Sequence, residues 1–487
     1  MSIRLSQVLQ GNAGADPVIT GVTADSRKVK PGFLFAALPG SKVDGRTYVD
    51  GAVAAGAAAI LAPDDVSHPA VPVVHATDLR RAYALAAAAF WGAQPAVCVA
   101  VTGTNGKTSV ATFCRQIFAR LGRKAASMGT LGVTVSAPGV ADVQITPPGL
   151  TTPDAADVAE LMATLAAQGV THLALEASSH GIDQRRLDGV TLTAAGFLNL
   201  TQDHLDYHGT MGVYRAAKLR LFEDLLPAGE TAVLNADSDQ YAVFAKAAAR
   251  SDHPLLSTGQ AGQGLRLADR RLVADGQQLT IAHEGRSFDI RLPLAGAFQA
   301  DNALAAAGLC IAAGEDAAAV LAALERLQGA PGRLQHVGAG PRGGEAYVDY
   351  AHTPDGLETV LKALRPHTQG RLIVVFGAGG DRDRGKRPLM GGIATRLADV
   401  AIVTDDNPRS ETPAAIRAEI LAAAPGAREI GDRREAIRAG AALLEKGDVL
   451  VVAGKGHEQG QLIAGVIHPF DDVAETAAAL GLEMAHG

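Results

Sequence analysis

The feature that most constrains this chain is a glycine-rich turn placed between an apolar strand and an amphipathic helix. Residues 96–101 have the pattern of a buried strand, and residues 102–109 (TGTNGKTS) follow directly. Apolar side chains then recur at helical spacing up to Gly122, a residue type that often follows a helix. Because glycines let backbone N–H groups approach an anion and a helix N-terminus attracts one, this arrangement predicts a phosphate-binding loop.

The residue types in this loop suit a bound nucleoside triphosphate. We expect Lys107 to contact the outer phosphates and the Thr108 hydroxyl to ligate Mg²⁺. The match to the pattern GxxxxGK[ST] is incomplete, because Val101 stands where that pattern has its first glycine. The loop alone does not separate an ATPase, a kinase and a ligase. The residues predicted to bind ATP here are Gly103, Thr104, Asn105, Gly106, Lys107, Thr108 and Ser109.

Breaks in the pattern divide the 487 residues into three predicted domains, about the number expected for this length. Pro95 ends a first domain after a helical stretch at 79–91, and the segment 329–332 (GAPG) has the composition of a hinge. The predicted fold class is α/β. It comprises an N-terminal α/β domain (1–94), a central P-loop ATPase-like parallel-sheet domain (95–330) and a C-terminal Rossmann-like doubly wound domain (331–487).

The predicted C-terminal domain alternates buried strands with helices, which favours a doubly wound parallel sheet. We expect strands at 346–348, 372–376, 400–404 and 449–453, with helices such as 354–364 and 433–444 between them. Polar, charged or glycine-rich clusters follow these strands, at 349–352, 377–387, 405–409 and 454–458. Because ligands bind at the carboxyl ends of such strands, we expect the four clusters to form one site.

Two strands of the predicted central domain also run into polar clusters. One strand ends at Glu176, and another, near Phe197, leads into a segment rich in Asp and His that contains His204. A single buried Glu or His is usually structural. Two such clusters in one nucleotide-binding domain indicate a metal and nucleotide site.

Lys218 lies on the apolar face of a predicted helix at 212–226, one turn from both Tyr214 and Phe222. Two interpretations remain open. The aliphatic stem can pack while the ammonium reaches water, or the amine can be buried with a lowered pKa. A neutral amine reacts with CO₂ to form a carbamate, which is an anion able to bind Mg²⁺.

Composition argues against several other classes of protein. The net charge of −7 provides no basic field for nucleic acid or a membrane surface. The three cysteines are widely separated, as expected in a reducing cytosol. The longest apolar stretch, 52–62, is shorter than the ~20 residues that span a bilayer. We therefore expect a cytoplasmic monomer with no nucleic-acid partner and no membrane insertion.

Taken together, these motifs resemble the Mur ligase family over essentially the whole chain. Residues 103–108 resemble its ATP loop, Glu176 and His204 its magnesium ligands, and Lys218 its carbamylated lysine. Asp301-Asn302, placed at the opening of a helix, resembles its adenine-contacting motif, and Arg333 its hinge arginine. The resemblance implies ATP as co-substrate and two Mg²⁺ ions. It also implies catalytic roles for Lys107, Glu176, His204 and Lys218.

Finer motifs resemble the branch of this family that adds meso-2,6-diaminopimelate to UDP-N-acetylmuramoyl-L-alanyl-D-glutamate. Asp25-Ser26-Arg27 resembles its uridine-site motif, whereas Ser41 stands where relatives commonly have His. The UDP-precursor contacts implied are Ser26, Thr151, Thr152, Ser178, Gln184 and Arg186. The amino-acid pocket implied consists of Arg382, Asp406, Asn407, Arg409, Gly454 and Glu458. In that pocket Arg409 would pair with the distal carboxylate and Glu458 with the distal ammonium.

The resemblance implies an acyl-phosphate mechanism in peptidoglycan precursor synthesis. The D-glutamyl side-chain carboxylate attacks the γ-phosphate of ATP, and the incoming amine then displaces phosphate from the acyl carbon. Three alternatives stay open. A lysine-adding Mur ligase differs chiefly in the pocket, and a folylpolyglutamate synthetase is disfavoured by Asp25-Ser26-Arg27. A regulatory P-loop NTPase would bind nucleotide and partners without ligation.

Overall fold

The computed structural model describes residues 2–9, 15–40, 44–147, 149–273 and 276–482. Ser41 therefore lies outside the described residues. The chain divides into two compact units, the first comprising residues up to Arg266 together with Leu304–Ala323. The second comprises Leu267–Ala303 and the chain from Leu324 onward. In the described part of the chain, no helix has the length and apolar character needed to cross a membrane.

The first unit begins with a small parallel sheet. Its strands are β3 (Gly21–Thr23), β4 (Phe33–Ala36), β5 (Ala59–Ala62) and β6 (Val73–His75), in that order. Two short strands, β1 (Ile3–Arg4) and β2 (Val18–Ile19), pair beside the helix α1 (Leu5–Val8). The helices α2 (Val49–Ala54) and α3 (Leu79–Trp91) complete this part. The bounds of α3 confirm the predicted helix at 79–91, which Asp78 caps and the left-handed Gly92 ends.

The central sheet of the first unit confirms the predicted parallel arrangement. Its order is β10-β9-β8-β11-β7-β12-β13-β14-β15. Neighbouring strands are parallel from β8 through to β15 in this order. The strand before the loop, β7 (Val97–Thr102), lies between β11 (His172–Glu176) and β12 (Ala194–Phe197). The outer strands are β8 (Ala125–Gly129), β9 (Gly132–Ala137), β10 (Val140–Thr146), β13 (Thr231–Asn235), β14 (Leu255–Gly259) and β15 (Leu265–Val273). Strands β9 and β10 form an antiparallel extension at one edge.

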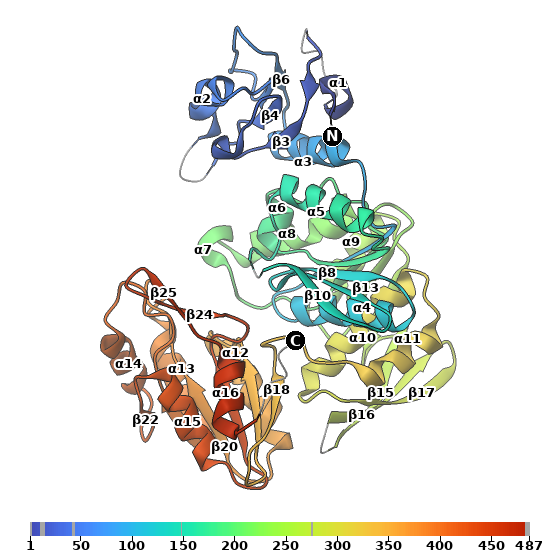
Figure 1. Cartoon of the computed structure of the whole chain (residues 1–487). Coiled ribbons are helices and arrows are strands. Elements are labelled where there is room, and N and C mark those ends of the chain that lie inside the picture. Colours follow the sequence, from blue (N-terminus) through green and yellow to red (C-terminus); the bar gives the residue numbers. More distant parts are fainter. Residues whose placement is uncertain (1, 10–14, 41–43, 148, 274–275, 483–487) are drawn as a thin grey trace. The chain divides into compact units, whose positions relative to one another are not determined.

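Helices connect these strands (Figure 1). They are α4 (Lys107–Arg120), α5 (Ala155–Ala167), α6 (Ser179–Asp183), α7 (Leu205–His208), α8 (Met211–Arg220), α9 (Tyr241–Arg250) and α11 (Ala317–Ala323). The single helix predicted at 212–226 is in fact α8 followed by a π-helical turn, Leu221–Leu225. Such a turn inserts a residue into the helical ladder and changes the direction in which the following side chains point.

In the second unit, a six-stranded sheet has the order β18-β19-β23-β20-β21-β22. Its strands are β18 (Gln335–Ala339), β19 (Glu345–Asp349), β20 (Leu372–Phe376), β21 (Val400–Val403), β22 (Arg428–Glu429) and β23 (Val449–Ala453). All neighbours are parallel except β18, which adds an antiparallel edge. The four predicted strands and the doubly wound topology are thus confirmed.

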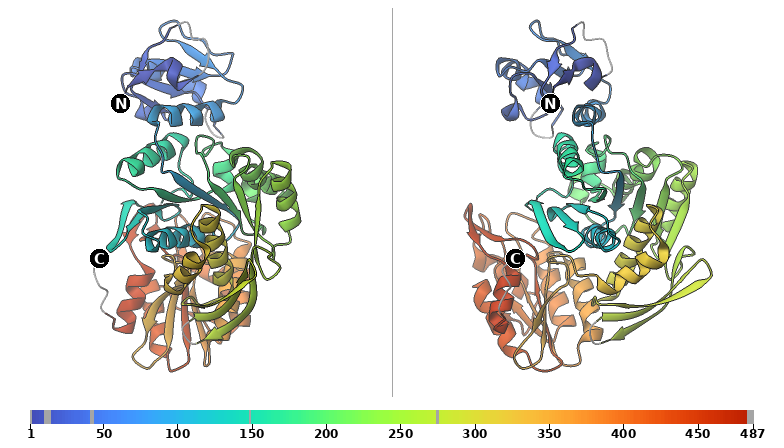
Figure 2. Two further views of the ribbon diagram at one scale, coloured as in Figure 1. Left: turned by 90° about the vertical axis from the view of Figure 1, so that its right-hand side faces the viewer. Right: turned by 45° about the vertical axis from the view of Figure 1, so that its right-hand side comes forward.

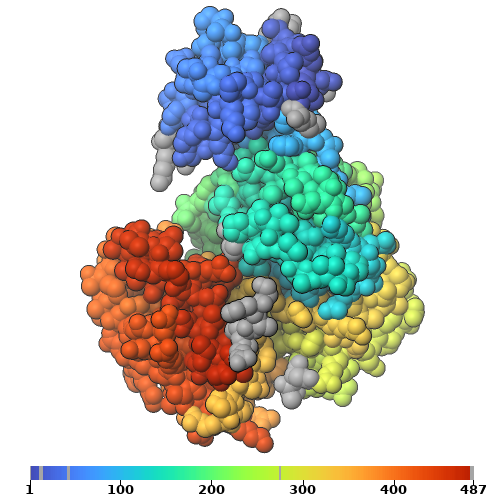
Figure 3. Space-filling view, viewed as in Figure 1, coloured from blue at the N-terminus to red at the C-terminus, as the bar shows by residue number. Residues whose placement is uncertain are grey.

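Alternate residues of these strands face two separate cores, because successive side chains of a strand point to opposite faces. Leu372, Val374 and Phe376 pack under α12 (Pro354–Leu364), α13 (Lys386–Leu397) and α14 (Pro413–Leu421). Ile373 and Val375 pack under α15 (Arg433–Leu443) and α16 (Asp472–Leu480). Helices therefore cover both faces of the sheet (Figure 2), and the orange and red atoms form one closely packed body (Figure 3).

Two hairpins complete the second unit, β16 (Gly276–His283) with β17 (Arg286–Leu292) and β24 (Gly460–Ile463) with β25 (Val466–Pro469). One sequence expectation is corrected in this unit. Asp301 and Asn302 do not open a helix, because α10 (Ala297–Ala312) begins one turn earlier. The helix starts directly after Gly296, whose φ of 89° suits a helix boundary, so Asn302 lies inside α10 and is buried.

A buried ion pair holds the helices α15 and α16 together beneath the carboxyl end of β23. The side chains of Arg433 and Asp472 are fully buried, and Arg433 donates two hydrogen bonds of 2.7 Å to that carboxylate. Replacing Arg433 with Met leaves Asp472 buried without its partner. We expect Arg433→Met to lower the free energy of unfolding of this unit by about 3–5 kcal/mol, measured by denaturant unfolding.

The neighbouring Arg434 supplies the control, because it pairs with Glu475 at the surface and is half-exposed. Arg434→Met should leave the unfolding midpoint nearly unchanged, since exposed pairs contribute little. Equal effects of the two substitutions would contradict the importance assigned to the buried pair.

Candidate active site

The phosphate loop joins β7 to α4, and α4 begins at Lys107 itself. Gly106 has a φ of 91°, a conformation that L-residues with side chains rarely adopt, so glycine is required there. The Lys107 ammonium donates to the carbonyl oxygens of Gly103 at 2.9 Å and Thr104 at 3.0 Å. The lysine therefore folds over a loop whose N–H groups lie at the positive end of a helix.

Asn199, which follows β12, organises this loop from the neighbouring strand. Its Oδ1 accepts hydrogen bonds from the backbone N–H groups of Thr104 at 3.1 Å and Asn105 at 2.9 Å. Its Nδ2 donates to the Asn105 carbonyl at 3.2 Å. Sequence reasoning did not assign Asn199 to the site, although it stands in the polar cluster after a predicted strand.

Lys218, on α8, is only 1% exposed, and its Nζ donates to the Gly103 carbonyl at 2.8 Å. The ammonium also lies 4.6 Å from the centre of the Tyr214 ring. Burial lowers the pKa of Lys218 well below its usual value, and the positive charge of Lys107 lowers it further. Of the two interpretations open from the sequence, the structure therefore supports the buried amine.

Glu176 ends β11 and is 2% exposed. Its Oε2 accepts from the hydroxyls of Thr108 at 3.0 Å and Thr130 at 3.2 Å, and its Oε1 accepts from the Thr130 N–H at 2.8 Å. A Cβ on Gly129 would lie 2.0 Å from Oε1, so only glycine fits beside this carboxylate. Thr130 was not predicted as a site residue, because the loop after β8 carries no motif.

Hydroxyl and carboxylate oxygens are the hard donors that Mg²⁺ prefers, so the adjoining Thr108 and Glu176 fit such an ion. The partly exposed His204 lies near the loop, with its ring centre 6.0 Å from that of Tyr214, the residue beneath Lys218. Among the residues with described positions, no group of three or more His, Cys, Asp or Glu side chains forms a metal-binding set.

The predicted contacts for the muramoyl peptide are bonded to the same end of β11. The hydroxyls of Thr151 and Thr130 are 2.9 Å apart, and the Thr152 hydroxyl donates to the Glu176 carbonyl at 2.8 Å. The Ser178 hydroxyl donates to the Thr152 hydroxyl at 3.0 Å. Segments 151–152 and 178 therefore meet the phosphate loop at Glu176.

Arg186 extends this network. Its Nη1 donates to the Thr152 carbonyl at 2.6 Å, and its Nη2 donates to the Gln184 side chain at 2.8 Å. All five residues predicted from the central domain for the UDP-linked precursor thus belong to one hydrogen-bonded group. The sixth, Ser26, lies in a 3₁₀ turn (Ser26–Lys28) that Asp25 caps. A cleft of about 1130 Å³ adjoins that turn, lined by residues that include Ser26, Tyr83, Trp91 and Asp154.

In the second unit, the structure brings five of the six residues predicted for the amino-acid pocket close together, and Arg382 is the exception. The Asn407 side chain donates to Glu458 Oε2 at 2.8 Å, and Arg409 Nη1 donates to the Gly380 carbonyl at 2.7 Å. Asp406 and Gly454 are buried beside them, whereas Arg382 is exposed. Backbone and side-chain bonds link all four predicted clusters: Gly380 to Asn407, Lys386 to His352 and Gly454 to Asp349.

Lys455 is a further residue of this pocket that sequence reasoning did not assign. It is fully buried, and its Nζ donates to Asn407 Oδ1 at 2.9 Å and to Glu458 Oε2 at 3.1 Å. These bonds fix two of the predicted contacts. Both bonds to Glu458, from Asn407 and from Lys455, use the same oxygen, Oε2.

The two remaining predicted ATP contacts also belong to the second unit. Arg333 places its guanidinium 4.4 Å from the centre of the Tyr350 ring. The nearby Asp349 accepts from the N–H groups of Leu334 and Ala351. Burial raises the pKa of this carboxyl to about 6. The Asn302 amide donates to the Gln299 side chain at 3.1 Å.

By its fold and site, the chain falls in the class of ATP-dependent ligases. Three successive segments match sequence profiles of one family. Residues 18–91 match "Mur ligase family, catalytic domain", 101–310 match "Mur ligase middle domain", and 332–456 match "Mur ligase, glutamate ligase domain". The chain belongs to the Mur ligase family.

Several relatives carry the same name, UDP-N-acetylmuramoyl-L-alanyl-D-glutamate–2,6-diaminopimelate ligase. The one from Caulobacter vibrioides is 72% identical over 481 residues, which cover 99% of each chain. The one from Bradyrhizobium diazoefficiens is 52% identical over 99% of this chain and 100% of its own. A solved structure of a ligase with this name is 35% identical, covers 99% of each chain and has a TM-score of 0.74.

A solved MurF ligase from Thermotoga maritima in complex with ADP has a TM-score of 0.62 at 18% identity. It covers 94% of this chain and 96% of its own, and it supports the three-domain fold.

Proposed function

We propose that this protein ligates meso-2,6-diaminopimelate to UDP-N-acetylmuramoyl-L-alanyl-D-glutamate, at the expense of ATP, in cytoplasmic peptidoglycan precursor synthesis. The observation that carries this proposal is the carboxylate of Glu176, which is bonded on one side to Thr108 of the phosphate loop. On its other side, it is bonded to Thr130, which contacts Thr151 of the expected muramoyl-peptide site. A shared carboxylate suits a reaction that transfers phosphate from ATP to the bound precursor.

The chain's own residues position the reactants and offset their charge. The phosphate loop and Lys107 hold the triphosphate, so that the γ-phosphate lies next to the precursor's D-glutamyl carboxylate. That carboxylate attacks phosphorus, ADP leaves, and an acyl phosphate forms. The amine of diaminopimelate then attacks the acyl carbon and loses a proton, and phosphate leaves. Mg²⁺, when bound at Thr108 and Glu176, neutralises charge on the transferring phosphoryl group.

The amino-acid pocket provides opposite charges for the carboxylate and the ammonium at the distal end of the incoming amino acid: Arg409 for the first and Glu458 for the second. The planar guanidinium of Arg409 suits bidentate pairing with the distal carboxylate of diaminopimelate. Its backbone has a φ of 53° and is bonded to β24 and the following turn, so the side chain starts from a fixed point. Lysine lacks that carboxylate and would leave the guanidinium without its intended partner. The pocket therefore favours diaminopimelate over lysine.

This proposal predicts that phosphate release requires the UDP-linked dipeptide and diaminopimelate together. We expect kcat/KM for diaminopimelate to exceed that for L-lysine by about 10⁴, the range reached by sites that hydrogen-bond a missing group. Arg409→Ala should reduce this ratio by about 100-fold or more, and Arg409→Lys should restore only part of it, because the ammonium lacks the planar fork.

Arg396, on the exposed side of α13 and paired with Glu358, supplies the matched control. Arg396→Ala should keep the selectivity of the wild type. Efficient lysine addition by the wild type would identify a lysine-adding ligase. A rate of ATP hydrolysis that does not depend on the dipeptide or on the amino acid would instead indicate a regulatory NTPase.

We further propose that Lys218 carries a carbamate, which would orient Mg²⁺ together with Glu176 and His204. Because burial keeps the pKa of Lys218 low, the neutral amine that reacts with CO₂ is available at lower pH than for an ordinary lysine. We expect Lys218→Ala to lower kcat by about 100-fold or more, and a short carboxylic acid to restore part of the activity by replacing the lost anion.

The control for that experiment is Lys246→Ala on α9, which removes an exposed lysine of the same unit and should retain full activity. A fully active Lys218→Ala protein would rule out the carbamate. Rescue by a short amine in place of the acid would also rule it out.

A further inference from the structure

The side chain of Tyr83 joins two segments that are far apart in the sequence. Tyr83 lies on α3 and is only 2% exposed. Its hydroxyl accepts a hydrogen bond from the N–H of Ala24 at 3.2 Å and donates one to Asp154 Oδ1 at 2.5 Å. Burial and the adjacent Asp154 raise the pKa of Tyr83, so the hydroxyl keeps the proton that it donates.

The two partners of this hydroxyl belong to the two segments that are expected to bind opposite ends of the precursor. Ala24 precedes Asp25, which caps the 3₁₀ turn that holds Ser26, the expected uridine contact. Asp154 caps α5 by accepting from the Ala156 N–H, and it follows Thr151 and Thr152 after a single proline. Tyr83 and Asp154 both line the cleft of about 1130 Å³.

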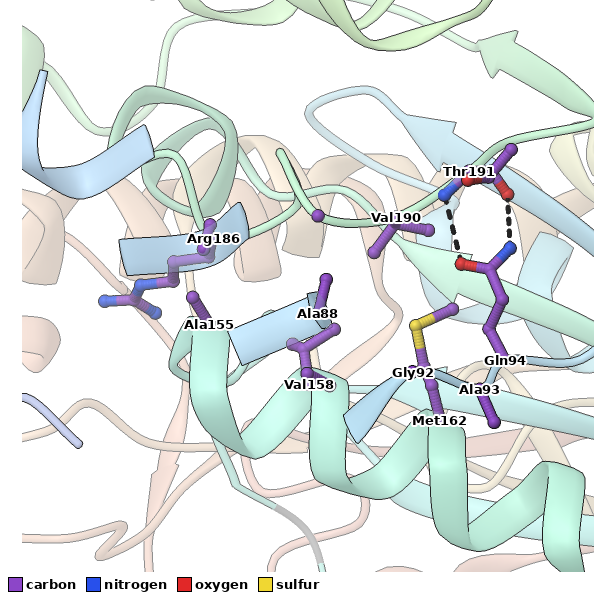
Figure 4. Close-up of a pocket in the computed structure, with 13 residues that line it drawn as sticks. Ala88, Gly92, Ala93, Gln94, Ala155, Val158, Met162, Arg186, Val190 and Thr191 are labelled. Atoms are coloured by element: carbon purple, nitrogen blue, oxygen red, sulfur yellow. Dashed lines mark hydrogen bonds between the residues drawn. The ribbon is translucent and has the colours of Figure 1, made fainter. Parts of the chain in front are cut away.

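Buried alanines of α3 and α5 pack together at this junction. The helices α3 and α5 face each other there with small side chains, and they leave a pocket of about 240 Å³ between them. Figure 4 shows Ala88 and Ala155 on its walls, with Arg186 at one end and Gln94 bonded to Thr191 at the other. Alanine methyl groups carry no directional interaction, whereas a hydrogen bond fixes both a distance and an angle between the groups that it joins.

The other polar links across the same junction, which include Arg81–Asp188 and Gln94–Thr191, each have at least one exposed or partly exposed partner. Lys28 pairs with Asp157 at 3.3 Å and Arg185 with Asp78 at 3.0 Å, and in both pairs the side chains are largely or partly exposed. Exposed pairs of this kind add little to rigidity. The buried hydroxyl of Tyr83 is therefore the link best suited to fix the distance between the two ends of the site.

We propose that Tyr83 is a positioning residue, which holds the uridine-binding turn and the peptide-binding segment at the spacing that one UDP-linked precursor spans. The inference rests on the proposed function and deepens it. Tyr83 does not touch the reacting atoms. Its loss should therefore weaken binding of a ligand that reaches both ends far more than binding of a ligand that reaches one end.

The test compares UDP, which occupies the uridine end alone, with UDP-N-acetylmuramoyl-L-alanyl-D-glutamate, which occupies both ends. Trp91 is the only tryptophan of the chain and lines the same cleft, so its fluorescence reports both ligands. We expect Tyr83→Phe to raise the Kd of the dipeptide by about tenfold, as loss of one hydrogen bond to a charged group does, and that of UDP by about twofold at most. KM for the dipeptide should rise while kcat stays within about twofold.

A second variant removes the same hydrogen bond by changing its acceptor, Asp154. Asp154→Ser keeps a good N-cap for α5 but is too short to reach Tyr83. It should give the same pattern, and the double variant should lose no more than either single one, because one bond is removed in each case. Additive losses, or equal losses for UDP and the dipeptide, would overturn the positioning role.

Controls separate this inference from the proposed function. Tyr241→Phe, on α9 and outside the cleft, should bind both ligands like the wild type. Unchanged ADP affinity in every variant verifies a folded phosphate loop. A wild-type protein that fails to bind the dipeptide would contradict the proposed function itself. If the wild-type protein binds the dipeptide and Tyr83→Phe binds it equally well, only the role of Tyr83 is contradicted.

Discussion

The buried carboxylate of Glu176 is the interaction on which the arrangement of the first unit's site depends. A carboxylate that is 2% exposed needs partners, because burying a charge without hydrogen bonds costs several kcal/mol. Three donors from two segments satisfy it: the Thr108 hydroxyl and both the N–H and the hydroxyl of Thr130. The same requirement therefore holds the phosphate loop and the segment after β8 at fixed positions around the end of β11.

A second electrostatic constraint lies on the other side of the phosphate loop. Lys107 and Lys218 donate to the same carbonyl, that of Gly103, and no buried environment accommodates two adjacent ammonium ions well. The repulsion between the two positive charges disappears if the buried Lys218 loses its proton. Lys107 is the one that stays charged, because it is partly exposed and binds phosphate as an ammonium. A neutral amine at Lys218 is the form that the proposed carbamate requires.

The elements predicted best from the sequence are those whose pattern is set by local chemistry. The helices α3 and α12 have the bounds that the sequence predicted, and the strands β19, β20, β21 and β23 lie at the predicted apolar runs. The residues missed were those placed by tertiary contacts. Thr130 and Asn199 act through neighbouring strands, and nothing local in the chain shows which segment they will meet.

Two local expectations also needed the structure. The helix α10 begins at Ala297, directly after the left-handed Gly296, so Asp301 and Asn302 lie inside the helix although both are residue types that often cap one. The helix α8 gives way to a π turn after Arg220, a feature that apolar spacing does not reveal. Asn407 and Glu458, two of the residues proposed for the amino-acid pocket, are joined by the buried Lys455, which the sequence analysis did not single out.

The central claim is that Glu176 joins the nucleotide site to the precursor site through hydrogen bonds of the chain itself, apart from any role toward Mg²⁺. The most direct test is the affinity of Glu176→Gln for UDP-N-acetylmuramoyl-L-alanyl-D-glutamate, measured by Trp91 fluorescence with no nucleotide and with divalent cations removed. In Glu176→Gln, the new side-chain amide turns an N–H group toward Thr108 and Thr130, which are themselves donors, so Thr130 is held less firmly. We therefore expect the variant to bind the dipeptide about tenfold more weakly than the wild type under these conditions. An unchanged affinity, with loss of activity confined to the magnesium-nucleotide step, would contradict it.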